Sequence, residues 1–219
     1  MDTALIDQLR QRIASMESAP ARLPLPTHPA LAPVVQLRAG GSYGVDSASL
    51  GLALLAEASR QGEWVAVAGW PDLGMEAAAA LGLDLARTVW VPDPGEHWLE
   101  VTAALVDAVR LVLLRPDPGL DASRLARPAA QLEARLRKRS AALVVWGEWP
   151  RCEARISIAR RRWQGLGQGH GVLHDRRLRI EVVRGAAPAV THDVVWGPQD
   201  LRIADPVRVQ RPWLQEAAG

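Results

Sequence analysis

Short apolar runs alternate with longer amphipathic segments between residues 34 and 146. The runs Leu111–Leu114 and Ala142–Trp146 are apolar throughout, which is typical of parallel strands covered on both faces by helices. Repeated alternation of strand and helix patterns predicts an α/β fold with a doubly wound, mostly parallel sheet. The predicted strands are residues 34–38, 64–68, 88–91, 109–114 and 142–146, and the predicted helices are residues 46–60, 75–83, 96–108 and 121–139.

The pattern changes after residue 150. Residues 155–163 and 178–183 alternate apolar and polar side chains with no helix between them, which predicts antiparallel strands added at the sheet edge. The four glycines between these strands predict a loop. We therefore expect a core spanning residues 34–185. Residues 186–219 contain four prolines and little periodicity, which predicts a partly ordered C-terminal tail.

The first 18 residues predict an amphipathic helix, because Leu5, Leu9 and Ile13 recur near helical spacing among polar side chains. Prolines in residues 19–33 then predict a stiff, extended linker. The apolar stripe of the helix could dock on a neighbouring protomer or a partner protein, or it could fold onto its own core. No basic segment precedes an apolar run near the N-terminus, and no apolar run approaches the roughly 20 residues of a membrane span. We therefore expect a soluble, cytoplasmic protein with no membrane partner.

The formal net charge of +2 over 219 residues gives little support for general nucleic-acid binding, so only local clusters of basic residues could favour it. Cys152 is the single cysteine, which excludes an intramolecular disulfide and a cysteine-based zinc site. His170 and His174 are four residues apart, but the flanking glycines disfavour a helix and no third ligand is evident. We expect neither a metal nor a cofactor.

The segment from Gly41 to Ala48 occupies the place where nucleotide-binding α/β domains carry the phosphate loop G-x-x-x-x-G-K-[ST]. Gly41 and Gly44 are glycines, but Asp46 stands at the second conserved glycine, Ser47 at the lysine and Ala48 at the metal-binding hydroxyl. The acidic side chain would repel a triphosphate, and no lysine offsets it. The segment is therefore either a degenerate nucleotide loop or an ordinary strand–helix turn that never bound a nucleotide, and we expect no ATPase or other enzyme activity.

Arginines are concentrated in the two predicted edge strands. They could neutralise phosphates of DNA, or they could form a solvated face or a surface for an acidic protein. Trp196, Trp213 and Leu214 in the predicted tail could anchor a partner or pack on the domain. The candidate DNA contacts are Arg160, Arg161, Arg162, Arg176, Arg177 and Arg179.

An ordered set of segments resembles the ImuA family of RecA-like proteins, including an actinobacterial branch sometimes described as SulA-like. The resemblance extends from the glycine-rich segment and its helix to residue 185. It is carried by GEWVAVAGWP (62–71), LGLDLARTVWVPD (81–93), LVLLRP (111–116), LEARLRKRSAALVVW (132–146), RISIARRRWQGL (155–166) and LRIEVVRG (178–185).

The resemblance implies a RecA-like fold and a non-catalytic role in a damage-inducible translesion-synthesis complex, the mutasome. It implies binding to ImuB, an inactive relative of Y-family DNA polymerases, with contact through the C-terminal region. An error-prone C-family polymerase and the sliding clamp would be indirect partners, RecA and single-stranded DNA further candidates, and the protein would join the nucleoid during DNA damage. Two alternatives stay open: a SulA-like cell-division inhibitor that binds the tubulin-like division protein, and a RecA-like DNA-binding ATPase.

Overall fold

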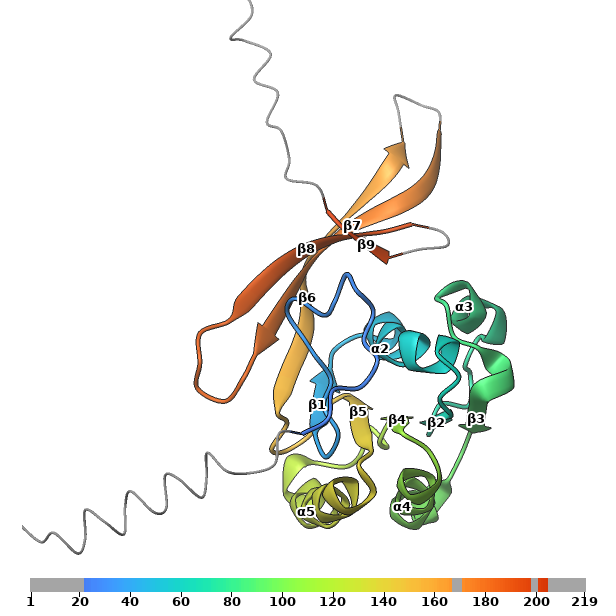
Figure 1. Ribbon diagram of the computed structural model, residues 1–219, viewed down its shortest axis with the longest axis vertical. Coiled ribbons are helices and arrows are strands. Elements are labelled where there is room, and N and C mark those ends of the chain that lie inside the picture. Colours follow the sequence, from blue (N-terminus) through green and yellow to red (C-terminus); the bar gives the residue numbers. More distant parts are fainter. Residues whose placement is uncertain (1–21, 167–170, 198–200, 205–219) are drawn as a thin grey trace, which may run out of the picture.

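The computed structural model of the protein describes residues 22–166, 171–197 and 201–204. Nine strands form one sheet in the order β3-β2-β4-β5-β1-β6-β7-β8-β9. Five of its pairings are parallel and three are antiparallel, so the predicted mixed α/β class with a mostly parallel sheet is confirmed. Figure 1 shows the arrangement of the strands and helices.

The inner strands of the parallel part of the sheet are buried on both faces, whereas the edge strand formed by residues 88–91 is only partly buried. Side chains of the inner strands alternate between two apolar clusters: Val65 and Leu113 belong to one, whereas Ala66 and Leu114 belong to the other. This two-sided burial explains why the corresponding runs in the sequence are continuously apolar. The strands are β1 (Ser42–Val45), β2 (Val65–Ala68), β3 (Thr88–Val91), β4 (Leu111–Leu114) and β5 (Ala142–Trp146).

Within the described residues, four α-helices cover the two faces of the sheet. Helices α2 (Ala48–Arg60) and α3 (Met75–Ala80) pack on one face, and α4 (Trp98–Ala108) and α5 (Ala122–Arg139) pack on the other (Figure 1). The side chain of Asp121 caps α5 by accepting a hydrogen bond from the Arg124 amide. Short 3₁₀ helices occupy Leu85–Arg87 and Gly95–His97.

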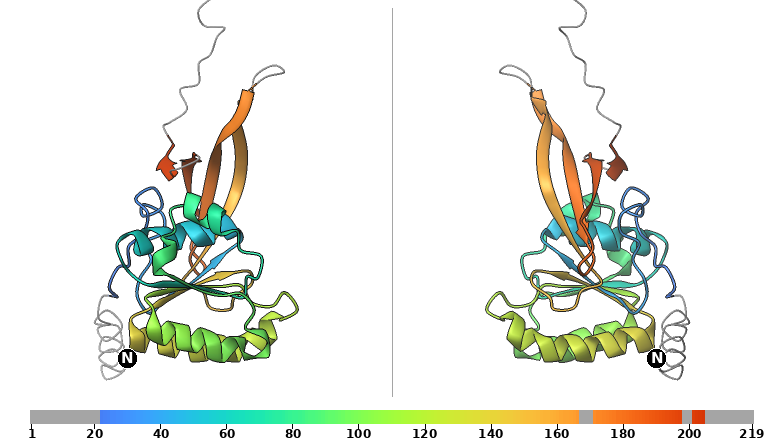
Figure 2. Two further views of the ribbon diagram at one scale, coloured as in Figure 1. Left: turned by 90° about the vertical axis from the view of Figure 1, so that its right-hand side faces the viewer. Right: turned by 90° about the vertical axis from the view of Figure 1, so that its left-hand side faces the viewer.

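The remaining strands continue the sheet in antiparallel order. Strand β6 (Ala154–Leu166) pairs with β1 only at its start and then forms a long hairpin with β7 (Gly171–Val183). Strands β8 (Val190–Trp196) and β9 (Leu201–Ile203) complete the edge. The β6–β7 hairpin extends well beyond the helical layers (Figure 2). The predicted antiparallel edge strands are confirmed, and both are longer than predicted.

Two predictions at the start of the core are wrong. Residues 34–38 form no strand; apart from one isolated bridge between Pro24 and Arg38, this segment is a turn and loop. The first strand is instead β1, where the sequence predicted a glycine-rich turn. The apolar side chains of residues 34–37 are buried as expected, but they are buried in a loop. The side chain of Gln36 satisfies one backbone group of this loop by donating a hydrogen bond to the carbonyl oxygen of Leu25 at 2.8 Å.

The segments flanking the predicted core also differ from expectation. Leu25, Ala30 and Leu31 are buried in the main cluster, so residues 22–33 pack on the domain and do not form an extended linker. Proline prevents a helix there but does not prevent burial. Past residue 185, β8 and β9 belong to the sheet, so the tail prediction is wrong for residues 190–196 and 201–203. The predicted helix of residues 1–18 lies outside the described residues. Within the described part of the chain, no helix has the length and apolar character needed to cross a membrane.

Candidate functional site

Half of the predicted phosphate loop, Ser42–Val45, is strand. Gly44 lies within β1, Gly41 immediately precedes it, and Ala48 is the first residue of α2. Only Asp46 and Ser47 lie between the strand and the helix. A phosphate cradle needs several successive loop amides that point at the anion, and a two-residue connection does not supply them. The geometry therefore favours the ordinary strand–helix turn over the degenerate nucleotide loop.

Asp46 has a structural role at this turn. Its Oδ2 accepts a hydrogen bond from the Ile158 amide at 3.0 Å, and its own amide donates to the Ile156 carbonyl at 3.3 Å. These contacts attach the end of β1 to the base of β6. Ser47 and Ser49 share a hydrogen bond at 2.9 Å between their hydroxyls, and the Ser47 side chain does not cap α2. The negative charge of the Asp46 carboxylate also interacts favourably with the N-terminus of α2, and the same charge would repel a bound phosphate.

The two glycines are explained by packing at the amino end and middle of β1. A Cβ on Gly41 would lie 2.5 Å from Oε2 of Glu153, and one on Gly44 would lie 3.1 Å from Sγ of Cys152. Both neighbours belong to the segment that enters β6. The two glycines therefore let β1 and this segment pack closely, and a side chain at either position would have to displace the Glu153 carboxylate or the Cys152 thiol.

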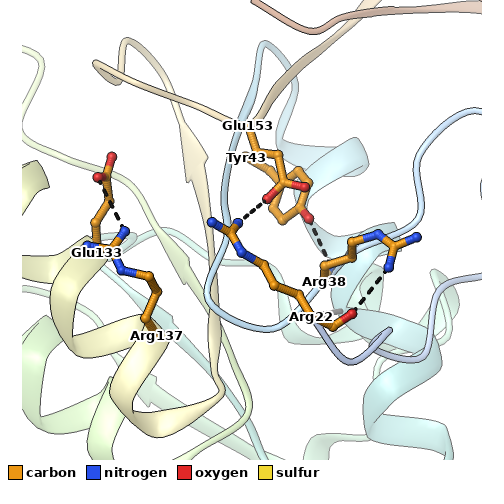
Figure 3. A network of polar contacts seen from close by, with 6 residues as sticks. All are labelled: Arg22, Arg38, Tyr43, Glu133, Arg137 and Glu153. Atoms are coloured by element: carbon orange, nitrogen blue, oxygen red, sulfur yellow. Dashed lines mark hydrogen bonds and ion pairs between the residues drawn. The ribbon is translucent and has the colours of Figure 1, made fainter. Parts of the chain in front are cut away.

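A polar network fixes the same end of β1 (Figure 3). The Tyr43 hydroxyl accepts a hydrogen bond from the Arg38 amide at 2.8 Å. Arg22 donates to Glu153 at 2.8 Å, and Arg38 donates to the Arg22 carbonyl at 3.2 Å. Burial, and secondarily the charge of Glu153, raises the pKa of Tyr43 to about 12. The tyrosine therefore acts as a neutral hydrogen-bonding anchor for the strand.

A cavity of about 240 Å³ lies beside this network. It is lined by charges of both signs, and two of its three guanidinium groups are already paired: Arg22 with Glu153, and Arg137 with Glu133 at 3.9 Å. Figure 3 shows both pairs. Because the cations are largely neutralised, the cavity has a mixed-charge surface that is poorly suited to a phosphate.

Cys152 does not have the surroundings of a nucleophile. Its Sγ donates to the Trp149 carbonyl at 3.2 Å, and burial raises the pKa of the thiol, which disfavours the reactive thiolate. Among residues 22–166, 171–197 and 201–204, no three histidine, cysteine or acidic side chains are grouped so that they could hold a metal ion. His170 lies outside these ranges.

The six candidate arginines lie together on the β6–β7 hairpin but on two different faces. The register pairs Arg160 with Arg179 and Arg162 with Arg177, so these four share one face. The register also pairs Arg161 with Leu178, which places Arg161 on the opposite face, and Arg176 belongs to that face too. The two strands thus bring the six arginines together, but the alternation of side chains along a strand places them on both faces of the hairpin.

Acidic side chains neutralise only part of the cluster. Arg179 makes two hydrogen bonds of 2.8 Å to Asp193, which lowers the pKa of that carboxyl. Within the described part of the chain, Arg160, Arg161 and Arg162 are exposed and form no ion pair. The three consecutive arginines of β6 are therefore the basic residues best placed to meet an anionic partner.

Trp196 is not an exposed partner anchor. Its side chain is 4% exposed and belongs to the main apolar cluster, with the Arg176 guanidinium 4.4 Å from the ring centre. The exposed aromatic residue in this region is Trp163, at 51% exposure, which the sequence analysis did not single out. The sequence feature that could have indicated this exposure is the position of Trp163 directly after three arginines on a strand with alternating side chains. The other predicted partner contacts, Leu5, Leu9, Ile13, Trp213 and Leu214, lie outside the described residues.

Sequence reasoning also missed a cavity of about 370 Å³ at the carboxyl ends of β2, β3 and β4. Open α/β sheets commonly bind ligands at this edge. Its lining includes Trp98, several prolines and the ion pair of Arg115 with Asp72 at 3.3 Å. The Arg115 guanidinium also lies 4.5 Å from the ring centre of Trp146. These contacts already satisfy the cation, so the cavity offers mainly apolar and acidic surface.

Comparison with known proteins identifies the family. A family model described as the MT3502 N-terminal domain matches residues 30–151, which is more than half of the chain. The chain belongs to the MT3502 N-terminal domain family. A relative from Mycobacterium tuberculosis, the uncharacterized protein Rv3395c, is 37% identical over 121 residues. That match covers 53% of this chain and 57% of the relative, so the chain spans little more than half of the relative's length.

The MT3502 match ends at Arg151 and therefore covers the parallel strands β1 to β5 and their helices. Strands β6 to β9, with the arginines and Trp163, follow the matched residues. The family match thus covers the parallel part of the sheet and its helices. The function of the β6–β7 hairpin can be inferred only from the residues of the hairpin itself.

Proposed function

We propose that this protein is a non-catalytic, RecA-like accessory subunit of a translesion-synthesis mutasome. In this role it binds an ImuB-like, inactive homologue of Y-family polymerases and supports damage-induced mutagenesis. The error-prone C-family polymerase and the sliding clamp are its indirect partners. The observation that carries the non-catalytic part is the two-residue connection between β1 and α2, which lacks a phosphate cradle and a lysine.

The sheet topology supports the RecA-like part of the proposal. A parallel block in the order β3-β2-β4-β5-β1, extended by antiparallel strands beyond β1, suits the doubly wound core expected from the ImuA resemblance. The mycobacterial relative is consistent with an actinobacterial branch of that family. The scaffold would then present binding surfaces in place of a nucleotide site.

The partner contact is proposed to lie in the C-terminal segment after β9. Trp196 packs in the core and is removed from the candidate contacts. Trp213 and Leu214 keep this role, since aromatic anchors are favoured in binding hot spots. The apolar stripe Leu5, Leu9 and Ile13 is proposed as a second docking element.

The test is a binding assay with purified proteins. The full chain should retain the ImuB-like protein, whereas a chain ending after Ala204 should keep the circular dichroism spectrum of the full chain and lose the partner. Trp213→Ala with Leu214→Ala should reproduce the loss, and Arg202→Gln on the exposed edge strand is the matched control. Retention of the tubulin-like division protein in place of the ImuB-like protein would overturn the proposal in favour of the SulA-like alternative.

Nucleotide binding is tested separately. Titration with ATP and magnesium should leave the tryptophan fluorescence unchanged, and phosphate release should not exceed that of a protein-free blank. Saturable binding with hydrolysis would contradict the non-catalytic assignment and favour the RecA-like ATPase alternative.

A further inference from the structure

The upper part of the β6–β7 hairpin has a free edge. Strand β6 pairs with β1 only through Ala154, Arg155 and Ile156, and in the described residues its later part pairs with β7 alone. Figure 2 shows this part projecting away from the helical layers. Charged residues at a free edge prevent unwanted strand pairing, so arginines alone would need no further explanation. The exposed Trp163 on this strand does need one.

A row of aromatic and cationic side chains crosses this part of the sheet on one face. The register places Trp163 opposite Arg176, and Arg176 opposite Trp196. The Arg176 guanidinium lies 5.8 Å from the ring centre of Trp163 and 4.4 Å from that of Trp196. The row runs from a buried indole through a half-buried guanidinium to an indole that is half in solvent.

This row holds Trp163 in place without burying it. Trp196 is fixed by the apolar cluster, and cation–π contacts then link Arg176 to both rings. An aromatic ring that is both ordered and exposed can stack on a flat ligand with little loss of conformational entropy. The geometry therefore provides a stacking platform at the end of the row.

Unneutralised charge surrounds the platform. Arg161 lies on the same face of β6 as Trp163. Arg160 and Arg162 lie on the opposite face of the same free edge. Arg160 and Arg162 also stand directly opposite Arg179 and Arg177, and like charges in this relation destabilise a sheet. On the β7 side of these pairs, Asp193 binds the Arg179 guanidinium and also feels the positive charge of Arg177. Arg160 and Arg162, on the β6 side, have no carboxylate partner among the described residues. The binding of a polyanion would relieve the remaining repulsion.

We propose that the β6–β7 hairpin binds single-stranded nucleic acid along the free edge of β6. A base stacks on Trp163, Arg161 binds a phosphate on the same face, and Arg160 and Arg162 bind phosphates from the other face of the edge. Flat bases joined by regularly spaced phosphates match both elements of the site. An acidic peptide would match the arginines but would leave the indole unused. A duplex keeps its bases stacked inside the helix, so it would also leave Trp163 unused.

The proposal goes beyond the mutasome assignment and is tested on the purified full chain alone. The probe is a fluorescently labelled oligothymidylate of about 15 nucleotides, measured by anisotropy over a range of salt concentrations. Trp163→Ala should weaken binding by about 5- to 150-fold, the loss measured for one stacked base, and Trp163→Phe should keep most of the affinity. Arg161→Gln should reduce the slope of log K against log salt by about 0.7, the value for one phosphate contact on a single strand.

Arg179→Gln is the matched control. It lies on the same hairpin and is exposed, but Asp193 already binds its guanidinium, so its removal should leave affinity and salt slope nearly unchanged. Thermal unfolding of each variant checks that the fold persists. The proposal is overturned by an absence of salt-dependent binding, by equal losses in Arg161→Gln and Arg179→Gln, or by duplex binding that Trp163→Ala leaves unchanged. Tighter binding of polyglutamate than of oligothymidylate would also overturn it and identify an acidic protein surface.

Discussion

Replacing Trp196 with alanine should destabilise the whole domain. The indole is 4% exposed within the main cluster, and removal of such a side chain costs about 3–5 kcal/mol in transfer free energy and cavity formation. The lost contact with Arg176, 4.4 Å from the ring centre, adds to this cost. Trp163→Ala is the matched control, because that ring is 51% exposed and its removal should cost less than about 1 kcal/mol.

Urea denaturation followed by far-ultraviolet circular dichroism measures both variants. With a slope of about 2–3 kcal/mol per molar urea, Trp196→Ala should lower the urea midpoint by about 1–2.5 M. For a domain of this size the melting temperature should fall by roughly 6–20 °C. A loss below about 1 kcal/mol for Trp196→Ala would refute the placement of β8 in the core and would return Trp196 to the candidate partner contacts.

Three further outcomes are expected. Gly69→Ala should cost about 2–5 kcal/mol in denaturant unfolding, because Gly69 has φ +75° and a Cβ would lie 2.1 Å from the Arg115 carbonyl oxygen. The single tyrosine, Tyr43, should not ionise near pH 10 in an absorbance titration, because the fold raises its pKa to about 12. Its contribution to stability is therefore complete below pH 10 and is lost as the pH rises toward 12. Asp46→Ala should lower the free energy of unfolding by about 1–2 kcal/mol through loss of the Ile158 hydrogen bond, and calorimetry should detect no gain in ATP binding.

The parallel block was predictable because its signal is local. Strands β4 and β5 appear in the sequence as uninterrupted apolar runs, and two-sided burial requires such runs. The start of α5 was predictable for the same reason, since Asp121 is a favoured residue at the N-terminal cap of a helix.

The first strand was misplaced because its cause is not local. Gly41 and Gly44 have the spacing of a turn, yet they lie in or beside a strand that packs closely against Glu153 and Cys152, more than 100 residues later in the chain. The burial of Trp196 and the exposure of Trp163 likewise depend on the register of β6, β7 and β8, including the irregularity between Ile158 and Arg160. The pairing register of these strands cannot be predicted from composition or from the periodicity of apolar residues.

The most direct test of the proposed role is the damage-induced mutation frequency of cells that lack this protein and are complemented with defined variants. Deletion should abolish the induced mutations, and the wild-type chain should restore them. Ser47→Ala should also restore them fully, because the proposed role needs no phosphate chemistry at that hydroxyl. An unchanged induced mutation frequency in the deletion strain would contradict the assignment to a mutagenic complex.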